Sequence, residues 1–242
     1  MSNLTESIDD AFLFKAILMI GGPGSGKSYI IKNIFKDKVK VVSSDAIFEF
    51  LLKKQNLPLK IDKKNDAQYA LQMDQRNKAI QLLKTPIGNY INGMLPLVVD
   101  GTGKNFKKIE IQKKELEEIG YDVYCIMVNT TLEVAKERNL KRARSVPPEL
   151  VSDAWNEVQH NLGKYSQMFG SSFLIVDNNS QLNMQQLNKI ENTILNSKLK
   201  NRKGQEVINW LKANNKSYYS DYIKKDFSIT LEEKIKNLFI KP

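Results

Sequence analysis

A glycine-rich stretch near the N-terminus constrains the fold more than any other part of the sequence. Residues 20–28 read Ile-Gly-Gly-Pro-Gly-Ser-Gly-Lys-Ser, so a glycine is followed, after four residues, by Gly-Lys-Ser. An apolar, strand-like run at 16–20 precedes this stretch, and a helix-like run at 29–35 follows it. A Gly-x₄-Gly-Lys-Ser pattern between a strand and a helix is typical of a phosphate-binding loop.

Each residue type in this loop has a chemical task. Glycines let successive backbone N–H groups point at the α- and β-phosphates, and the N-terminus of the following helix adds partial positive charge. Lys27 would reach the β- and γ-phosphates, and the Ser28 hydroxyl would complete a Mg²⁺ site. A turn that binds nothing would not need either side chain there. The residues expected to bind ATP are Gly21, Gly22, Pro23, Gly24, Ser25, Gly26, Lys27, Ser28 and Tyr29.

The composition is typical of a globular protein in water. Of 242 residues, 41% are hydrophobic and 26% are charged, and no apolar run approaches the length of a membrane span. The N-terminus carries acids and lacks the basic start of a signal peptide, so we expect no membrane segment and a cytoplasmic location. The one cysteine, Cys125, lies in an apolar run and is expected to be a buried thiol.

A net charge of +10 favours an anionic partner. The excess is concentrated after Gln181, where aromatic residues lie among lysines. Such aromatics can stack on nucleic-acid bases, but they can equally pack a small helical segment onto the main domain. Both interpretations stay open, so nucleic acid is a possible partner on charge alone.

Strand-like and helix-like runs alternate through most of the chain. The expected strands are at 16–20, 39–42, 97–102, 121–128 and 173–177, with an all-helical insert at 55–95. Apolar strands alternating with helices predict an α/β fold with a parallel sheet of about five strands and helices on both faces. We expect this domain to span residues 1–200, followed by a small basic helical extension at 201–242.

Two aspartates lie where predicted strands end. Asp45 comes shortly after the second strand and Asp100 ends the third. The carboxyl ends of parallel strands meet at one edge of the sheet, where ligands of such folds bind. Asp100 is therefore expected to anchor Mg²⁺, and Asp45 to accept a proton from an acceptor hydroxyl. The alternatives are an N-cap for Asp45 and a turn residue for Asp100.

Three arginines lie in a basic stretch before Pro147. Arg138 and Arg142 are four residues apart, which predicts that they share a helix face and converge on the phosphates, with Arg144 beside them. We expect a lid at about 138–147 that closes over the phosphates. A solvated basic face is the alternative.

The order of these parts resembles the kinase domain of phage polynucleotide kinases, and it is similar to the zeta-toxin group of P-loop kinases, whose third strand ends in acid-Gly-Thr. The resemblance covers about 16–180. The motifs that carry it are Asp45 after strand two, Asp100-Gly101-Thr102 after strand three, and Arg138-Asn139-x-Lys141-Arg142-x-x-x-Val146-Pro147 in the lid.

The resemblance implies roles for several of these residues. It places Lys27 and Ser28 on ATP and Mg²⁺, makes Asp45 the general base, and places Arg138 and Arg142 on the phosphates. Polynucleotide kinases follow their base, three residues on, with an arginine that grips the acceptor strand, whereas this chain has Phe48.

Zeta toxins phosphorylate a UDP-activated sugar, and the helical insert with Arg76 looks closer to their substrate-binding part, although Arg76 could also be an ordinary surface residue. The residues expected to bind the acceptor are Asp45, Arg76, Thr102 and Arg144.

Together these features predict an ATP- and Mg²⁺-dependent kinase that phosphorylates a hydroxyl group. The acceptor would be a nucleic-acid end, a nucleotide or a nucleotide sugar. The expected catalytic residues are Lys27, Asp45, Arg138 and Arg142. A P-loop ATPase and a nucleic-acid-binding module are the rivals from other classes, and the lack of an Asn-Lys-x-Asp string argues against a GTPase.

Overall fold

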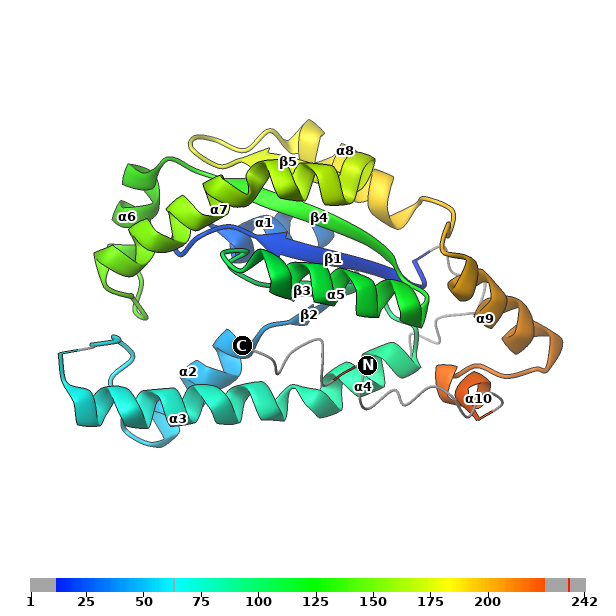
Figure 1. Ribbon diagram of the computed structural model, residues 1–242, viewed down its shortest axis with the longest axis horizontal. Coiled ribbons are helices and arrows are strands. Elements are labelled where there is room, and N and C mark those ends of the chain that lie inside the picture. Colours follow the sequence, from blue (N-terminus) through cyan, green and yellow to red (C-terminus); the bar gives the residue numbers. More distant parts are fainter. Residues whose placement is uncertain (1–11, 63, 225–234, 236–242) are drawn as a thin grey trace.

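The computed structural model describes residues 12–62, 64–224 and 235, and a five-stranded parallel sheet forms its centre (Figure 1). The strand order is β2-β3-β1-β4-β5, and every neighbouring pair is parallel. This confirms the predicted fold class. The strands are β1 (Lys15–Ile20), β2 (Lys40–Val42), β3 (Leu97–Asp100), β4 (Asp122–Asn129) and β5 (Phe173–Asp177).

Helices connect the strands and cover both faces of the sheet. None of the helices in the described ranges is both long and apolar enough to cross a membrane. They are α1 (Lys27–Phe35), α2 (Ser44–Lys54), α3 (Asp66–Leu82), α4 (Lys84–Asn92), α5 (Phe106–Ile119), α6 (Leu132–Leu140), α7 (Pro148–Phe169), α8 (Met184–Leu195), α9 (Arg202–Ala213) and α10 (Tyr219–Ile223), with a 3₁₀ turn at Gly170–Ser172.

The central strand β1 is buried on both faces. Successive side chains of a strand point to opposite sides, so Leu18 and Ile20 pack with α4, α5, α7, α9 and α10, while Ile17 and Met19 pack with α1 and α8. Figure 1 shows α5 and α7 on the near side of the sheet and α1 behind it. Because helices cover both faces, the strand is a continuous apolar run rather than an alternating one.

The helical insert packs partly on itself. Phe48 and Leu52 of α2, Ile61 of the segment between α2 and α3, and Ala79 of α3 form a small buried cluster, and Val146 packs against this cluster. In Figure 1, α2, α3 and α4 form a layer below the sheet. The insert therefore forms a second wall that faces the carboxyl edge of the sheet.

The C-terminal helices belong to the main core. Tyr219 and Tyr222 are buried in the same cluster as the sheet residues, and the rings of Phe14 and Tyr219 lie 6.0 Å apart, edge to face. Burial removes these two tyrosines from the set of aromatics that could stack on bases. Residues 225–234 and 236–242 of the predicted extension lie outside the described residues.

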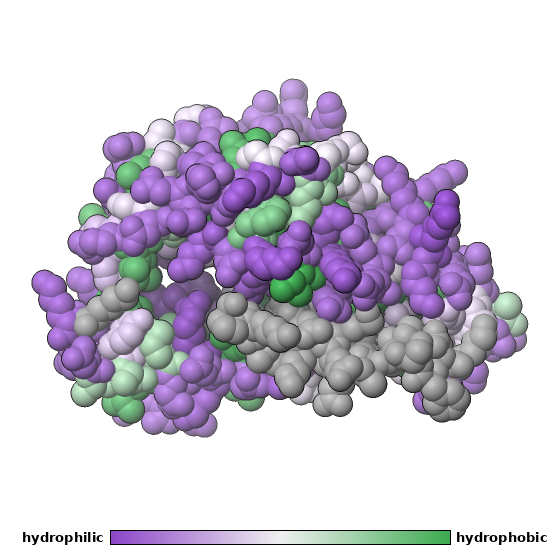
Figure 2. All heavy atoms as spheres, in the orientation of Figure 1, coloured by the Kyte–Doolittle hydropathy of each residue, from purple (hydrophilic) through white to green (hydrophobic). Residues whose placement is uncertain are grey.

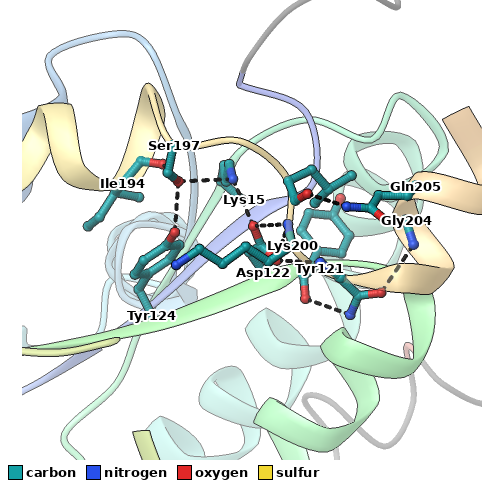
Figure 3. Close-up of polar contacts among 11 residues, drawn as sticks. Lys15, Tyr121, Asp122, Tyr124, Ile194, Ser197, Lys200, Gly204 and Gln205 are labelled. Atoms are coloured by element: carbon teal, nitrogen blue, oxygen red, sulfur yellow. Dashed lines mark hydrogen bonds and ion pairs between the residues drawn. The ribbon is translucent and has the colours of Figure 1, made fainter. Parts of the chain in front are cut away.

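A buried ion pair joins the C-terminal segment to the sheet (Figure 3). The Lys15 side chain has no exposed surface, and its Nζ donates to Asp122 Oδ2 at 2.8 Å and to Ser197 Oγ at 3.1 Å. Asp122 also accepts from the backbone N–H groups of Lys200 (3.0 Å) and Asn201 (2.8 Å). One carboxylate thus holds β1, β4 and the segment before α9 together.

We expect Asp122→Asn to lower the free energy of unfolding by about 3–5 kcal/mol, because it leaves the Lys15 ammonium buried without a countercharge. Glu49→Gln, which breaks the exposed Glu49–Lys53 pair within α2, is the control and should cost at most about 0.5 kcal/mol. Urea unfolding of the two variants measures both values. Equal costs would contradict the structural role of Asp122.

Candidate active site

The phosphate-binding loop lies between β1 and α1 and is closed by the backbone of α6. A Cβ at Gly24 would lie 2.0 Å from the carbonyl oxygen of Ala135 in α6, and Gly24 has φ +82°. Gly26 has φ +90° and precedes the first residue of α1. Both positions therefore require glycine, because a side chain at Gly24 would clash with α6 and both φ values favour glycine.

Asn178 supports the loop and was not found from the sequence. Its Nδ2 donates to the Ser25 carbonyl at 2.7 Å, its backbone N–H donates to Asn129 at 2.9 Å, and its carbonyl accepts from Arg138 Nη1 at 2.7 Å. The residue is buried and follows β5 directly. The one indication in the sequence was its position directly after the fifth predicted strand, at the edge of the sheet where ligands bind.

Lys27 begins α1 and folds back over the loop. Its Nζ donates to the carbonyl oxygens of Gly21 (2.7 Å) and Gly22 (3.4 Å). Burial lowers its pKa, while the nearby carboxylates of Asp100 and Asp45 act in the opposite direction. A half-buried ammonium held by neutral carbonyls is well placed to bind an anion.

Asp100 ends β3 and lies beside the loop. Burial raises its pKa, and attraction to Lys27 opposes that shift without cancelling it. Asp100 Oδ1 is buried and has no hydrogen-bond partner among the described residues. An orphaned carboxylate oxygen that shares a cavity with the Ser28 hydroxyl fits a hard cation such as Mg²⁺.

The rest of a Mg²⁺ shell would have to come from outside the protein. Within the described part of the chain, no group of three or more Asp, Glu, His or Cys side chains could hold a metal ion. Mg²⁺ commonly binds one or two protein oxygens and takes its other ligands from phosphates and water. Ser28 and Asp100 match that requirement.

Asp45 lies in the first turn of α2 but does not cap it. The N-cap is Ser43, whose side chain accepts from the Asp45 backbone N–H at 3.3 Å, so the N-cap alternative for Asp45 is wrong. The Asp45 carboxylate instead pairs with Arg144 Nη2 at 2.5 Å. The Arg144 guanidinium lies over the Phe48 ring at 5.7 Å, and Arg76 also lies over that ring.

The arginines converge in a different way from the one predicted. Arg138 is in the last turn of α6, which ends at Leu140, so Arg142 lies beyond the helix and the shared helix face is wrong. Asn139 closes the following loop: its side chain donates to the Val146 carbonyl at 2.8 Å and accepts from the Val146 N–H at 3.2 Å. The chain turns back there, and both arginines line one cavity.

Two adjoining cavities meet at this edge of the sheet. The first, which we call the loop cavity, has a volume of about 260 Å³ and the second, the insert cavity, about 310 Å³. Lys27, Asp45 and Asp100 line both. In Figure 2 a hollow walled mostly by hydrophilic residues opens between the upper part of the molecule and the layer below it. The other residues of the loop cavity are Gly24, Gly26, Ser28, Tyr29, Arg138 and Arg142.

The insert cavity brings Arg76 of α3 and Thr102 together, as well as residues that the sequence analysis did not single out. These are Lys104, Asn105, Lys108 and Gln112, from the first half of α5 and the turn before it. Asn105 caps α5 by accepting from the Lys108 N–H at 3.0 Å. The sequence could have indicated these residues, because a helix with lysines in its first turn directly follows the third strand, at the edge of the sheet where ligands bind.

Sheet order, loop and site together define a P-loop domain of the kinase-like type, with a nucleotide-binding fold. The chain belongs to the family described as an AAA domain, whose match covers residues 17–164. No curated protein shows significant sequence similarity to it.

Solved structures share this fold. A candidate kinase from Chloroflexus aurantiacus J-10-fl superposes with a TM-score of 0.53 at 17% identity, over 75% of this chain and 98% of that one. A structure from the PezAT chromosomal toxin-antitoxin system of Streptococcus pneumoniae gives a TM-score of 0.50 at 17% identity. The match covers 84% of this chain and 89% of that one. At such identities the likeness is one of fold.

We expect Gly24→Ala to lower the free energy of unfolding by about 1–3 kcal/mol, because the added Cβ collides with the α6 backbone. Gly163→Ala is the matched control. A Cβ at Gly163, inside α7, meets nothing within 4 Å, so alanine should stabilise the protein by about 0.5–1 kcal/mol. Urea unfolding tests both signs, and an unchanged Gly24→Ala stability would contradict the close approach.

The raised pKa of Asp100 predicts a pH-dependent effect on stability. The folded state favours the protonated carboxyl, so stability falls as the pH rises from about 3.9, the ordinary value, through the raised pKa. Ligand-free Asp100→Asn should therefore melt at a higher temperature than wild type at pH 7, and this difference should close below about pH 4.

Calorimetry at several pH values measures this difference. Asp153→Asn, which removes an exposed carboxylate of α7, is the control and should leave the melting temperature unchanged. Mg²⁺ with nucleotide should stabilise wild type more than Asp100→Asn. A lower melting temperature of ligand-free Asp100→Asn at pH 7 would show that the lost attraction to Lys27 outweighs the relieved burial.

Proposed function

We propose that the protein is an ATP- and Mg²⁺-dependent kinase that transfers the γ-phosphate to a hydroxyl group of a nucleotide-type substrate or a nucleic-acid end. The observation that carries this proposal is the position of Asp45. Its carboxylate lines both the loop cavity and the insert cavity. A group between a nucleotide and a second ligand is placed to take part in transfer between them.

The loop cavity has the groups that a triphosphate requires. Backbone N–H groups of the loop and the N-terminus of α1 would bind the β-phosphate, with Lys27 reaching the β- and γ-phosphates. Arg138 and Arg142 would contact the γ-phosphate from the other side of the cavity. Ser28 and Asp100 would hold Mg²⁺, which when bound neutralises charge on the phosphates.

Asp45 would act as the general base. The acceptor hydroxyl gives its proton to the carboxylate while its oxygen bonds to the γ-phosphorus. The bond from that phosphorus to the β–γ bridging oxygen breaks, and its electron pair leaves with ADP. The ion pair with Arg144 would orient the Asp45 carboxylate. The positive charge of the Arg144 guanidinium would also balance the negative charge of that carboxylate.

The second cavity supports this proposal over an ATPase. Hydrolysis needs room for only one water beside the γ-phosphate, whereas the insert cavity is larger than the loop cavity and is lined by Arg76, Thr102 and several lysines. A cavity of this volume at the far side of Asp45 supports an organic acceptor.

The test is transfer of labelled γ-phosphate from ATP to hydroxyl-ended DNA and RNA, nucleosides, nucleotides and nucleotide sugars. We expect one acceptor class to be labelled and Asp45→Asn to lower kcat by about 10²–10⁴-fold with ATP affinity unchanged. Glu49→Gln, one turn further along α2, is the charge-matched control and should keep the wild-type rate. Equal ATP consumption by all three proteins with no labelled acceptor would favour an ATPase.

A further inference from the structure

We propose that the insert cavity binds the phosphate group of a small phosphorylated acceptor, such as a nucleoside monophosphate or a sugar phosphate, through Arg76 and Lys108. This deepens the proposed function by naming the chemical class of the acceptor, and it rests on that function only for the transfer step. Binding of the phosphate can be tested separately.

Besides Lys27, three cations line the insert cavity. Arg76 comes from α3, Lys104 from the turn before α5, and Lys108 from the first turn of α5. None of these three lines the loop cavity, whereas Lys27 lines both cavities. Their positions define a second anion site, distinct from the phosphate-binding loop.

These cations form no ion pair in the described part of the chain. None of the ion pairs there involves Arg76, Lys104 or Lys108, and the described contact of Arg76 is with the Phe48 ring at 5.7 Å. Burial lowers the pKa of Lys108, and repulsion by Arg76 lowers it further. Two like charges held close together in a partly buried place favour the binding of an anion between them.

The other lysines of α5 form ion pairs, so the lack of an ion pair is specific to Lys108. Lys107 pairs with Glu110 and Lys113 pairs with Glu117 at 2.6 Å, both within the helix. The lysine that faces the cavity is the exception. The acidic residues of α5 therefore pair with its surface lysines, while the positive charge of Lys108 in the cavity stays available to bind an anion.

The rest of the lining suits a compact organic group attached to a phosphate. Val42, Ile80, Val99 and Ile109 supply an apolar surface for a sugar or base. A volume of about 310 Å³ lies at the lower end of small-molecule pockets, which are about 300–1,000 Å³. One nucleotide or one sugar phosphate fits that volume, and Asp45 in the same cavity would face its hydroxyl group.

The experiment compares phosphorylated probes with their unphosphorylated forms. Uridine 5′-monophosphate, uridine, ribose 5-phosphate and ribose are titrated calorimetrically into the full-length protein, with Mg²⁺ and a non-hydrolysable ATP analogue occupying the loop. We expect at least one phosphorylated probe to bind roughly 10- to 100-fold more tightly than its partner. Arg76→Gln/Lys108→Gln should abolish that difference, while Lys107→Gln, the neighbouring surface lysine, should retain it.

The outcomes separate this proposal from the proposed function. If each phosphorylated probe binds no better than its partner, or the double variant binds it as wild type does, the phosphate site is wrong. Circular dichroism and ATP-analogue affinity of the double variant check that the chain is folded. A failure to bind the analogue, or phosphate-dependent binding with no transfer to any acceptor, contradicts the kinase proposal alone.

A nucleic-acid end is the remaining alternative, and transfer kinetics decide it. We expect the double variant to raise KM for a phosphorylated small acceptor by roughly 10-fold or more, with KM for ATP unchanged. A hydroxyl-ended oligonucleotide phosphorylated with a higher kcat/KM than every phosphorylated small acceptor would overturn the proposed acceptor class.

Discussion

The rest of the site depends on two opposite charges, Lys27 and Asp100, that share a partly buried place at the carboxyl edge of the sheet. β3 pairs with β1 in the register that sets Asp100 opposite Met19, two residues before Gly21, so its carboxylate comes next to the loop that ends in Lys27. Burial disfavours the charged form of both side chains, and each partly offsets the cost of the other. A phosphate with Mg²⁺ would satisfy both at once, so the unfavourable electrostatics of the ligand-free edge are themselves an argument for the ligand.

The insert and the lid loop are connected parts of one wall. Val146 packs against the insert cluster around Phe48, and the Ile61 N–H donates to the carbonyl of Ser145 at 3.3 Å. Arg144 then extends from this loop across Phe48 to Asp45. Because Arg76 lies over the same ring, the groups proposed to bind the acceptor, orient the base and close over the phosphates all share one buried phenylalanine.

The sequence predicted the elements and the loop well, since these depend on local patterns. Strand periodicity and the Gly-Lys-Ser motif are each set by neighbouring residues. At two positions local rules had two solutions, and the structure decides between them. Ser43 rather than Asp45 caps α2, and α6 ends at Leu140 so that Arg142 turns out of the helix. Spacing alone could not show either outcome.

Contacts between distant parts of the chain could not be predicted in this way. Asn178 is 153 residues from the Ser25 carbonyl that it holds, and Arg144 is 99 positions beyond Asp45. The close approach of Ala135 to Gly24 depends on how α6 packs, although the glycine itself was evident in the motif. Such contacts follow from the strand order, which a single sequence leaves open.

The distribution of charge changes the meaning of the basic composition. Net charge suggested a nucleic-acid partner, yet many surface lysines lie in short-range pairs with acids, as in Lys78–Asp74 and Lys141–Glu137, and contribute little field of their own. Two of the C-terminal tyrosines that could have stacked on bases are buried in the core. Arg76, Lys104 and Lys108 differ from those surface lysines, because they line a cavity and none of the ion pairs among the described residues involves them. The cations that line the two cavities, where the sheet, the insert and α5 meet, are placed to bind small anionic ligands.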